Sequence, residues 1–246
     1  MNIVACVKRV PNTEAEAKLA SDGQGLDSSS YQYMVSFYDE IAVEQAVQTK
    51  EALGGEVTVL SLGSKGGTKE IRECMAKGAD KAVVMVDENW QDRDCRATAK
   101  ILSAKISEQG ADLVYMGKVA TDRDNGAVGP MVATYLGWAC VTDVIELEMT
   151  ATGGTAKRET EAGIETVEFD LPAIVTCNKG LNEPRYAGLK GIMAAKKKPL
   201  EEVDAQGVDN QAQVVKVSLP EARKEGRMVD GVDALIEALQ NEANVL

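Results

Sequence analysis

The residues best suited to ligand binding form the loop GKVATDRDNGAVGP at 117–130, which directly follows an apolar run that predicts a strand. Gly126 and Gly129 would let the backbone approach a ligand closely. The loop leads into a predicted helix, whose first N–H groups have no partner inside the helix and would face an anion. The aspartates and the asparagine of the loop suit turn formation or ribose hydroxyls, although the carboxylates would repel a phosphate. The pattern favours a nucleotide site, and an ordinary strand-to-helix turn is the alternative.

Two further segments are expected at the same place. One is Cys6, near the end of the predicted strand Ile3–Val7. The other is Ser36–Asp39, where a predicted helix begins, together with Leu62 at the end of the second strand; Ser36 is a suitable N-cap for that helix. In an open parallel sheet the carboxyl ends of the strands meet at one edge, and ligands bind there. We therefore expect the three segments to line one site.

Composition excludes several other kinds of chemistry. The chain has no histidine, so a histidine-based catalytic triad and a histidine-containing zinc site are excluded. The run GSKGGTK at 63–69 lacks the Gly-Lys-Ser/Thr order of a P-loop. A net charge of −12 argues against nucleic acid as a partner, because phosphate binding needs clustered cations. The 5 cysteines form no CxxC pair and are expected to be reduced thiols. No catalytic constellation emerges.

Continuous apolar runs separated by helical patterns must position these loops. Such runs are typical of parallel strands that are buried on both faces, so we predict a Rossmann-like α/β fold of the adenine-nucleotide-binding type, with helices on both faces of the sheet. The predicted strands are Ile3–Val7, Glu56–Leu62, Ala82–Val86 and Asp112–Met116, and the predicted helices are Phe37–Ala52, Thr68–Lys77, Asp94–Gln109 and Gly129–Leu136.

The second half of the chain has a different sequence pattern. Four runs joined by Gly-Gly and Ala-Gly turns predict an antiparallel addition to the sheet: Val141–Glu148, Thr155–Thr160, Thr166–Phe169 and Ala173–Cys177. Residues 201–231 are polar without a strong period and cannot bury a core of their own, and Val232–Glu242 is again helical. We predict a nucleotide-binding domain at 1–200 and an extended C-terminal arm and helix at 201–246 that pack on a partner subunit.

A second motif lies in the stretch Leu171–Pro199, LPAIVTCNKGLNEPRYAGLKGIMAAKKKP. After a strand-like run and a polar turn, Leu189, Ile192 and Met193 recur at helical spacing. So small an apolar stripe cannot form a core alone, so it either packs locally or is presented to a partner. The stretch resembles the signature of the electron-transfer flavoprotein beta subunit, which carries nearly the same LNEPRYA, Leu, Ile-Met and KKK. The resemblance covers roughly residues 1–200.

The resemblance implies a heterodimeric electron carrier rather than an enzyme. In that family FAD is bound mostly by the alpha subunit, and the beta subunit holds a structural AMP. The residues that match the AMP-contacting stretches are Cys6, Ser36, Phe37, Tyr38, Asp39, Leu62, Asp122, Arg123, Asp124, Asn125, Gly126, Ala127, Val128, Gly129, Pro130, Met131, Val132 and Ala133. Two alternatives stay open: an electron-bifurcating type, with a second FAD in place of AMP and use of NADH, and a stand-alone adenine-nucleotide-binding module.

The resemblance also implies docking residues. The recognition loop at 177–199 would bind acyl-CoA and related dehydrogenases, with Leu189 anchored in a pocket of the partner. The implied docking residues are Leu181, Asn182, Glu183, Pro184, Arg185, Tyr186, Leu189, Ile192 and Met193, and Glu159 would hold the mobile FAD domain of the alpha subunit. Electrons would pass on to a membrane quinone oxidoreductase.

The start of the chain predicts where the protein works. Met1-Asn2 leads straight into a strand, so no signal peptide is expected, and no apolar run approaches the roughly 20 residues of a membrane span. We therefore expect a cytoplasmic protein without membrane insertion, whose eukaryotic equivalents would lie in the mitochondrial matrix.

Overall fold

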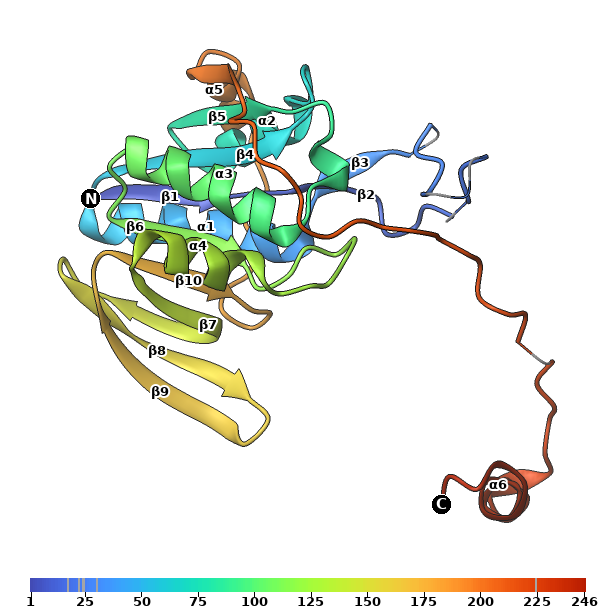
Figure 1. Ribbon diagram of the computed structural model, residues 1–246. Coiled ribbons are helices and arrows are strands. Elements are labelled where there is room, and N and C mark those ends of the chain that lie inside the picture. The colour runs from blue at the N-terminus through green and yellow to red at the C-terminus, as the bar shows by residue number, and fades with distance from the viewer. Residues whose placement is uncertain (17, 22, 24, 30, 224) are drawn as a thin grey trace.

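The structure, a computed structural model, describes residues 1–246 except 17, 22, 24, 30 and 224. Its centre is a nine-stranded sheet with the order β11-β5-β4-β1-β6-β10-β7-β8-β9 (Figure 1). The pairs from β11 to β7 are parallel, and β8 and β9 add an antiparallel hairpin. The strands are β1 (Asn2–Cys6), β4 (Glu56–Gly63), β5 (Lys81–Val86), β6 (Leu113–Gly117), β7 (Ala139–Met149), β8 (Gly153–Thr160), β9 (Gly163–Asp170), β10 (Ala173–Cys177) and β11 (Leu200–Asp204).

Helices cover both faces of the parallel part, which confirms the predicted fold class. The helices α1 (Phe37–Leu53) and α2 (Lys69–Lys77) pack on one face, and α3 (Cys95–Glu108) and α4 (Val128–Leu136) pack on the other. Successive side chains of a strand point to opposite faces. Ile3 and Ala5 of β1 accordingly join the first cluster, whereas Val4 and Cys6 join the second. This two-sided burial is the physical reason for the unbroken apolar runs in the sequence.

The position of β10 corrects the sequence prediction. Ala173–Cys177 was expected in the antiparallel addition, but β10 lies inside the parallel region, between β6 and β7. Its 5 residues are all buried, as a central strand requires. β7 is the strand of transition, because it runs parallel to β10 and antiparallel to β8.

Three strands were not predicted. β11 pairs with β5 although it contains Glu201, Glu202 and Asp204, and it forms the edge of the sheet. Charged side chains are common on edge strands, where they discourage pairing with other chains. β2 (Arg9–Pro11) and β3 (Tyr33–Val35) form a separate two-stranded ribbon.

The first residues of the C-terminal arm pack against the body of the molecule, and the rest of the arm extends away from it (Figure 1). Val208 is buried in the core cluster of α3 and α4. Asp94 accepts hydrogen bonds from the N–H groups of Gln211 and Ala212 with one carboxylate oxygen and caps α3 through Ala97 N–H with the other. The arm ends in α6 (Gly231–Ala238) and a π-helical turn at Leu239–Ala243, close to the predicted helix Val232–Glu242.

None of the helices in the described part of the chain has the length and the apolar composition needed to cross a bilayer.

Candidate functional site

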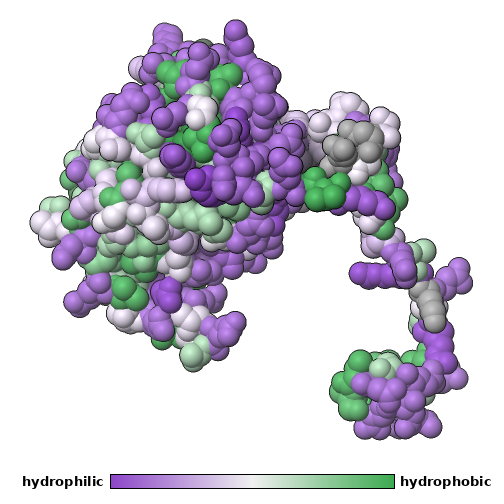
Figure 2. Space-filling model, viewed as in Figure 1, coloured by the Kyte–Doolittle hydropathy of each residue, from purple (hydrophilic) through white to green (hydrophobic). Residues whose placement is uncertain are grey.

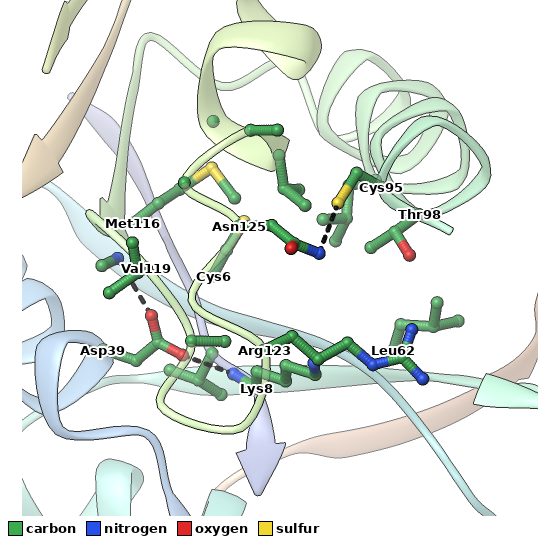
Figure 3. A pocket seen from close by; sticks show the side chains of 18 of the residues that line it. Cys6, Lys8, Asp39, Leu62, Cys95, Thr98, Met116, Val119, Arg123 and Asn125 are labelled. Atoms are coloured by element: carbon green, nitrogen blue, oxygen red, sulfur yellow. Dashed lines mark hydrogen bonds between the residues drawn. The ribbon is translucent and has the colours of Figure 1, made fainter. Parts of the chain in front are cut away.

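A pocket opens at the carboxyl ends of β1, β4 and β6, where the sequence predicts a ligand site (Figure 3). Half of the predicted nucleotide residues line it, namely Cys6, Asp39, Leu62, Arg123, Asn125, Gly126, Ala127, Val128 and Gly129. The other half, namely Ser36, Phe37, Tyr38, Asp122, Asp124, Pro130, Met131, Val132 and Ala133, are not among its lining residues.

The predicted residues that do not line the pocket have other surroundings. Val132 and Ala133 are buried between α4 and the sheet, whereas Phe37 and Met131 are exposed on the surface. Ser36 precedes α1, but its hydroxyl does not cap that helix. Its Oγ instead accepts a hydrogen bond from Thr121 N–H at 3.3 Å, which fixes the start of the loop after β6 and corrects the predicted capping role.

Sequence reasoning missed one complete wall of the pocket. Trp90 of η1 (Trp90–Asp92), Arg93, and Cys95 and Thr98 of α3 all line it. These residues follow β5, the third strand of the parallel sheet along the chain. Ligands bind at the carboxyl ends of parallel strands, and this rule led to the loops predicted after the other strands. It applies equally to the loop after β5, so the sequence contained the signal for this wall of the pocket.

The charge and the polarity of the lining fit a flat, apolar ring joined to an anion. Leu62, Trp90, Leu102 and Met116 supply apolar surface, and the first turn of α4 lies at the pocket. That helix approaches β10 closely, because a Cβ atom at Gly129 would lie only 2.6 Å from Thr176 Cγ2. The cationic side chains in the lining are Lys8, Arg93, Lys118 and Arg123. Free helix N–H groups and nearby cations together favour a phosphate.

Asp39 joins two strand ends at the bottom of this site. Its carboxylate accepts the N–H of Lys8 at 2.7 Å and the N–H of Gly117 at 2.9 Å (Figure 3). Any side chain at Gly117 would collide with Asp39. Burial raises the pKa of Asp39 to about 7, although the two N–H donors and the charge of Lys8 act in the opposite direction. Burial and the charge of Asp39 also raise the pKa of the Cys6 thiol, which therefore stays protonated.

The free energy of unfolding is expected to fall as the pH rises from about 4 to about 7. An aspartate in an unfolded chain has a pKa of about 3.9, so in this window the folded protein retains a proton on Asp39 that the unfolded chain has lost. Stability decreases with pH wherever the folded state binds more protons. Asp39→Asn should flatten the profile by up to about 1.4 kcal/mol per pH unit. Urea unfolding at several pH values measures both, and identical slopes would contradict the raised pKa.

The predicted docking segment has an anchored first part. Leu181 packs against the main core, and the Asn182 side-chain amide donates to Ile41 O and Gln45 Oε1, both at 3.1 Å. Arg185 binds two carboxylates of α1, Glu44 at 2.8 Å and Glu51 at 2.6 Å.

The Arg185 contacts change the ionisation of both acids. Burial alone would raise the pKa of Glu44, but hydrogen bonds from Arg185 and Gln48 outweigh it, so that the pKa lies below its usual value. The hydrogen bond from Arg185 also lowers the pKa of Glu51. Arg185 therefore clamps the segment to α1 through two ionised carboxylates.

The second part of the segment is exposed. Glu183 is exposed, Pro184 is half-buried, and Tyr186 is 99% exposed. The short helix α5 (Leu189–Ala195) follows, with Leu189 78% exposed and Ile192 and Met193 also on the surface. In Figure 2 apolar surface gathers where Figure 1 shows α5. The predicted docking residues therefore divide into residues that hold the segment in place and residues that face solvent.

Gly191→Ala is expected to lower the free energy of unfolding by about 1–3 kcal/mol, the usual cost of overpacking. A Cβ atom at Gly191 would collide with the carbonyl oxygen of Ala76 in α2, so the glycine sets how closely α5 approaches α2. Gly188→Ala is the matched control, because nothing lies within 4 Å of its added carbon, and we expect a change below about 0.5 kcal/mol. Urea unfolding compares them, and equal effects would contradict the close-packing role.

Glu159 lies on β8, where its carboxylate accepts a hydrogen bond from the buried Asn178 side chain at 2.9 Å. Asn178 follows β10 directly, so this contact links the antiparallel hairpin to the start of the docking segment. The Glu159 residue as a whole is exposed.

Comparison with known proteins identifies the family. A family model of the electron transfer flavoprotein domain matches residues 27–207. The electron transfer flavoprotein subunit beta of Bradyrhizobium diazoefficiens is 39% identical over 253 residues, and that of Bacillus subtilis is 33% identical over 259 residues. The mitochondrial subunit beta of Oryza sativa subsp. indica is 36% identical over 253 residues, and each of the three alignments covers 100% of both chains. The chain belongs to the electron transfer flavoprotein beta-subunit family.

The residues covered by the family match can be compared with the pocket and with the docking segment. The electron transfer flavoprotein domain at 27–207 contains the whole docking segment and most of the pocket. Cys6 and Lys8 at the end of β1 and the arm from residue 208 lie outside that domain match, and the full-length beta-subunit alignments include them. The resemblance found in the sequence is thereby confirmed at the level of the family.

Proposed function

We propose that the chain is the beta subunit of a heterodimeric electron transfer flavoprotein, which accepts electrons from acyl-CoA and related flavin dehydrogenases and passes them to a membrane quinone oxidoreductase. The observation that carries the proposal is the exposed apolar face of α5, held in place by the Arg185 clamp, in a chain whose full-length relatives are named subunit beta. An apolar anchor with a polar rim is a common arrangement of interface hot spots.

The proposed cofactor of this subunit is AMP, bound in the pocket at the strand ends. Trp90, Leu62 and Leu102 would face the adenine ring, and the first turn of α4 with Lys118 would face the phosphate. FAD, bound mostly by an alpha subunit, supplies the redox chemistry when present. The residues of this chain bind, orient and dock, and no redox group of their own is required.

The arm and Glu159 complete the proposal. The arm beyond Ala212 exposes Val215, Met228 and Val232, which suits it to packing on the surface of an alpha subunit. Glu159 is an exposed acidic residue, whose carboxylate would hold a cationic group of the mobile FAD domain. Dehydrogenase bound at α5 would then stay attached while the FAD domain samples different orientations.

Release of the bound nucleotides by denaturation tests this function. The purified complex should yield one FAD and one AMP per pair of subunits, measured by chromatography with mass spectrometry. Two FAD and no AMP would favour the electron-bifurcating type, in which a second FAD uses NADH. A colourless monomer that yields only an adenine nucleotide would favour a stand-alone nucleotide-binding module and would contradict the carrier function.

A further inference from the structure

The pocket is bridged from one wall to the other by side chains of the loop after β6. Arg123 donates a hydrogen bond to the carbonyl oxygen of Gln91 in η1, and the Asn125 side chain donates one to Cys95 Sγ of α3 at 3.2 Å. Figure 3 shows both side chains extending from the loop towards the α3 side of the cavity. These contacts join two walls that are about 30 residues apart in the sequence, and all of the residues involved except Gln91 line the pocket.

The bridging residues belong to a short, mostly exposed segment. We call residues 123–127 the flap. Before the flap, the loop is fixed by the ion pair of Lys8 and Asp122 at 2.7 Å and by the Thr121 N–H bond to Ser36. After it, the chain enters α4. The flap itself is mostly exposed, and Asp124 (φ 55°) and Gly126 (φ 62°) adopt left-handed conformations on either side of Asn125.

The two side-chain contacts form a two-point latch on an exposed segment, whose start is held by the backbone N–H groups of Arg123 and Asp124, both bonded to Ala120 O. Exposed segments with few buried contacts open locally at low free energy, whereas their fixed flanks do not. Opening the flap would break the Arg123 and Asn125 contacts and separate the two walls. It would leave the Asp39 contacts and the core of the sheet unchanged, because none of them involves the flap.

We propose that Arg123 and Asn125 close the flap over the pocket, so that it retains a mononucleotide and excludes a dinucleotide such as FAD. The proposal rests on the proposed nucleotide site. A mononucleotide ends inside the pocket, so the closed latch slows its release. A dinucleotide would have to continue outward between the two walls, and it would therefore need the latch to be open. Arg123 and Asn125 thus determine specificity as positioning residues of the flap.

The test is the release rate of radiolabelled AMP from the full chain, in the complex in which it is purified, after addition of excess unlabelled AMP. Because a charged hydrogen bond is lost, Arg123→Ala should release AMP about tenfold faster or more. Asn125→Ala should accelerate release less, by roughly threefold. The double variant should also gain affinity for FAD, measured by flavin fluorescence.

Arg96→Ala is the matched control. It removes a guanidinium from the same end of α3, where the contact of that group is with Asp209 O and not with the flap, so AMP release should be unchanged. Circular dichroism melting confirms that the variants fold.

The outcomes separate the latch from the nucleotide site. The proposal is supported if the wild type retains AMP and both latch variants, Arg123→Ala and Asn125→Ala, release it faster. Equal release rates in wild type and Arg123→Ala would overturn the latch and leave the nucleotide site intact. FAD held by the wild-type pocket would overturn the size selection. Failure of the wild type to bind either nucleotide would overturn the site and the latch together.

Discussion

Arg185→Ala is expected to lower the free energy of unfolding by about 3 kcal/mol or more, because it leaves a buried carboxylate without its partner. The side chain of Glu44 is only 3% exposed, and Arg185 reaches both of its oxygens. The same substitution weakens the attachment of the segment 181–186 to α1, because only the backbone N–H of residue 185, which donates to Glu44, and the side-chain amide of Asn182 would still bind that helix. Urea unfolding measures the stability, and limited proteolysis within the segment measures its release.

Two further variants isolate the cause of this effect. Glu51→Gln removes the other, half-exposed partner of Arg185, and exposed pairs contribute less than about 1 kcal/mol. Arg185→Ala combined with Glu44→Gln should recover part of the loss, because the variant no longer buries an unpaired charge. A loss for Arg185→Ala no greater than that for Glu51→Gln would contradict the buried-pair explanation.

The parallel part of the fold is predictable because burial on both faces leaves a direct trace in the sequence. β1, β5 and β6 contain continuous apolar runs, β4 is a run rich in β-forming residues, helical patterns separate the four, and the structure confirms each of them. The apolar run of β10 was equally clear. Its place in the sheet was not, because an apolar run does not specify its neighbours, and β10 follows the hairpin of β8 and β9 along the chain. Strand order is a property of tertiary packing.

Elements at the edge of the sheet are harder to predict, because their sequences carry no continuous apolar run. The charged sequence of β11 is compatible with an exposed loop, and it becomes a strand because β5 offers free backbone groups beside it. Trp90 and Arg93 lie in a short segment without periodicity after β5. The loop at 117–130 was predicted because it carries glycines and polar residues. The segment after β5 offered only its position at the carboxyl end of a parallel strand, a signal that was used for Cys6 and Leu62 but not for this segment.

The docking segment shows how one motif can serve two purposes. Asn182 and Arg185 bind α1, whereas Tyr186 and Leu189 face solvent. The sequence motif is continuous, so spacing cannot separate residues that hold the segment from residues that a partner would contact. The separation comes from the partners on α1, which lie more than 130 residues earlier in the chain.

If α5 is the docking element of the proposed carrier, Leu189→Ala should raise the KM of an acyl-CoA dehydrogenase for the flavoprotein about 30-fold, the ~2 kcal/mol typical of a hot-spot side chain. Leu189 is 78% exposed, so the substitution should change the free energy of unfolding by less than about 0.5 kcal/mol. The two effects are therefore separable, and steady-state electron transfer with urea unfolding on the same preparation measures both.

Ile164→Ala is the control that distinguishes docking from a general loss of apolar surface. Ile164 is also an exposed aliphatic side chain, but it lies on β9, at the edge of the sheet opposite to β11, which follows α5. Its truncation should leave the KM for the dehydrogenase unchanged. An equal KM for wild type and Leu189→Ala would remove α5 from the docking surface, and an equal rise in both variants would show that the effect does not depend on the position of the side chain. Only a rise confined to Leu189→Ala is consistent with an apolar anchor that the Arg185 clamp and the close contact at Gly191 hold in place.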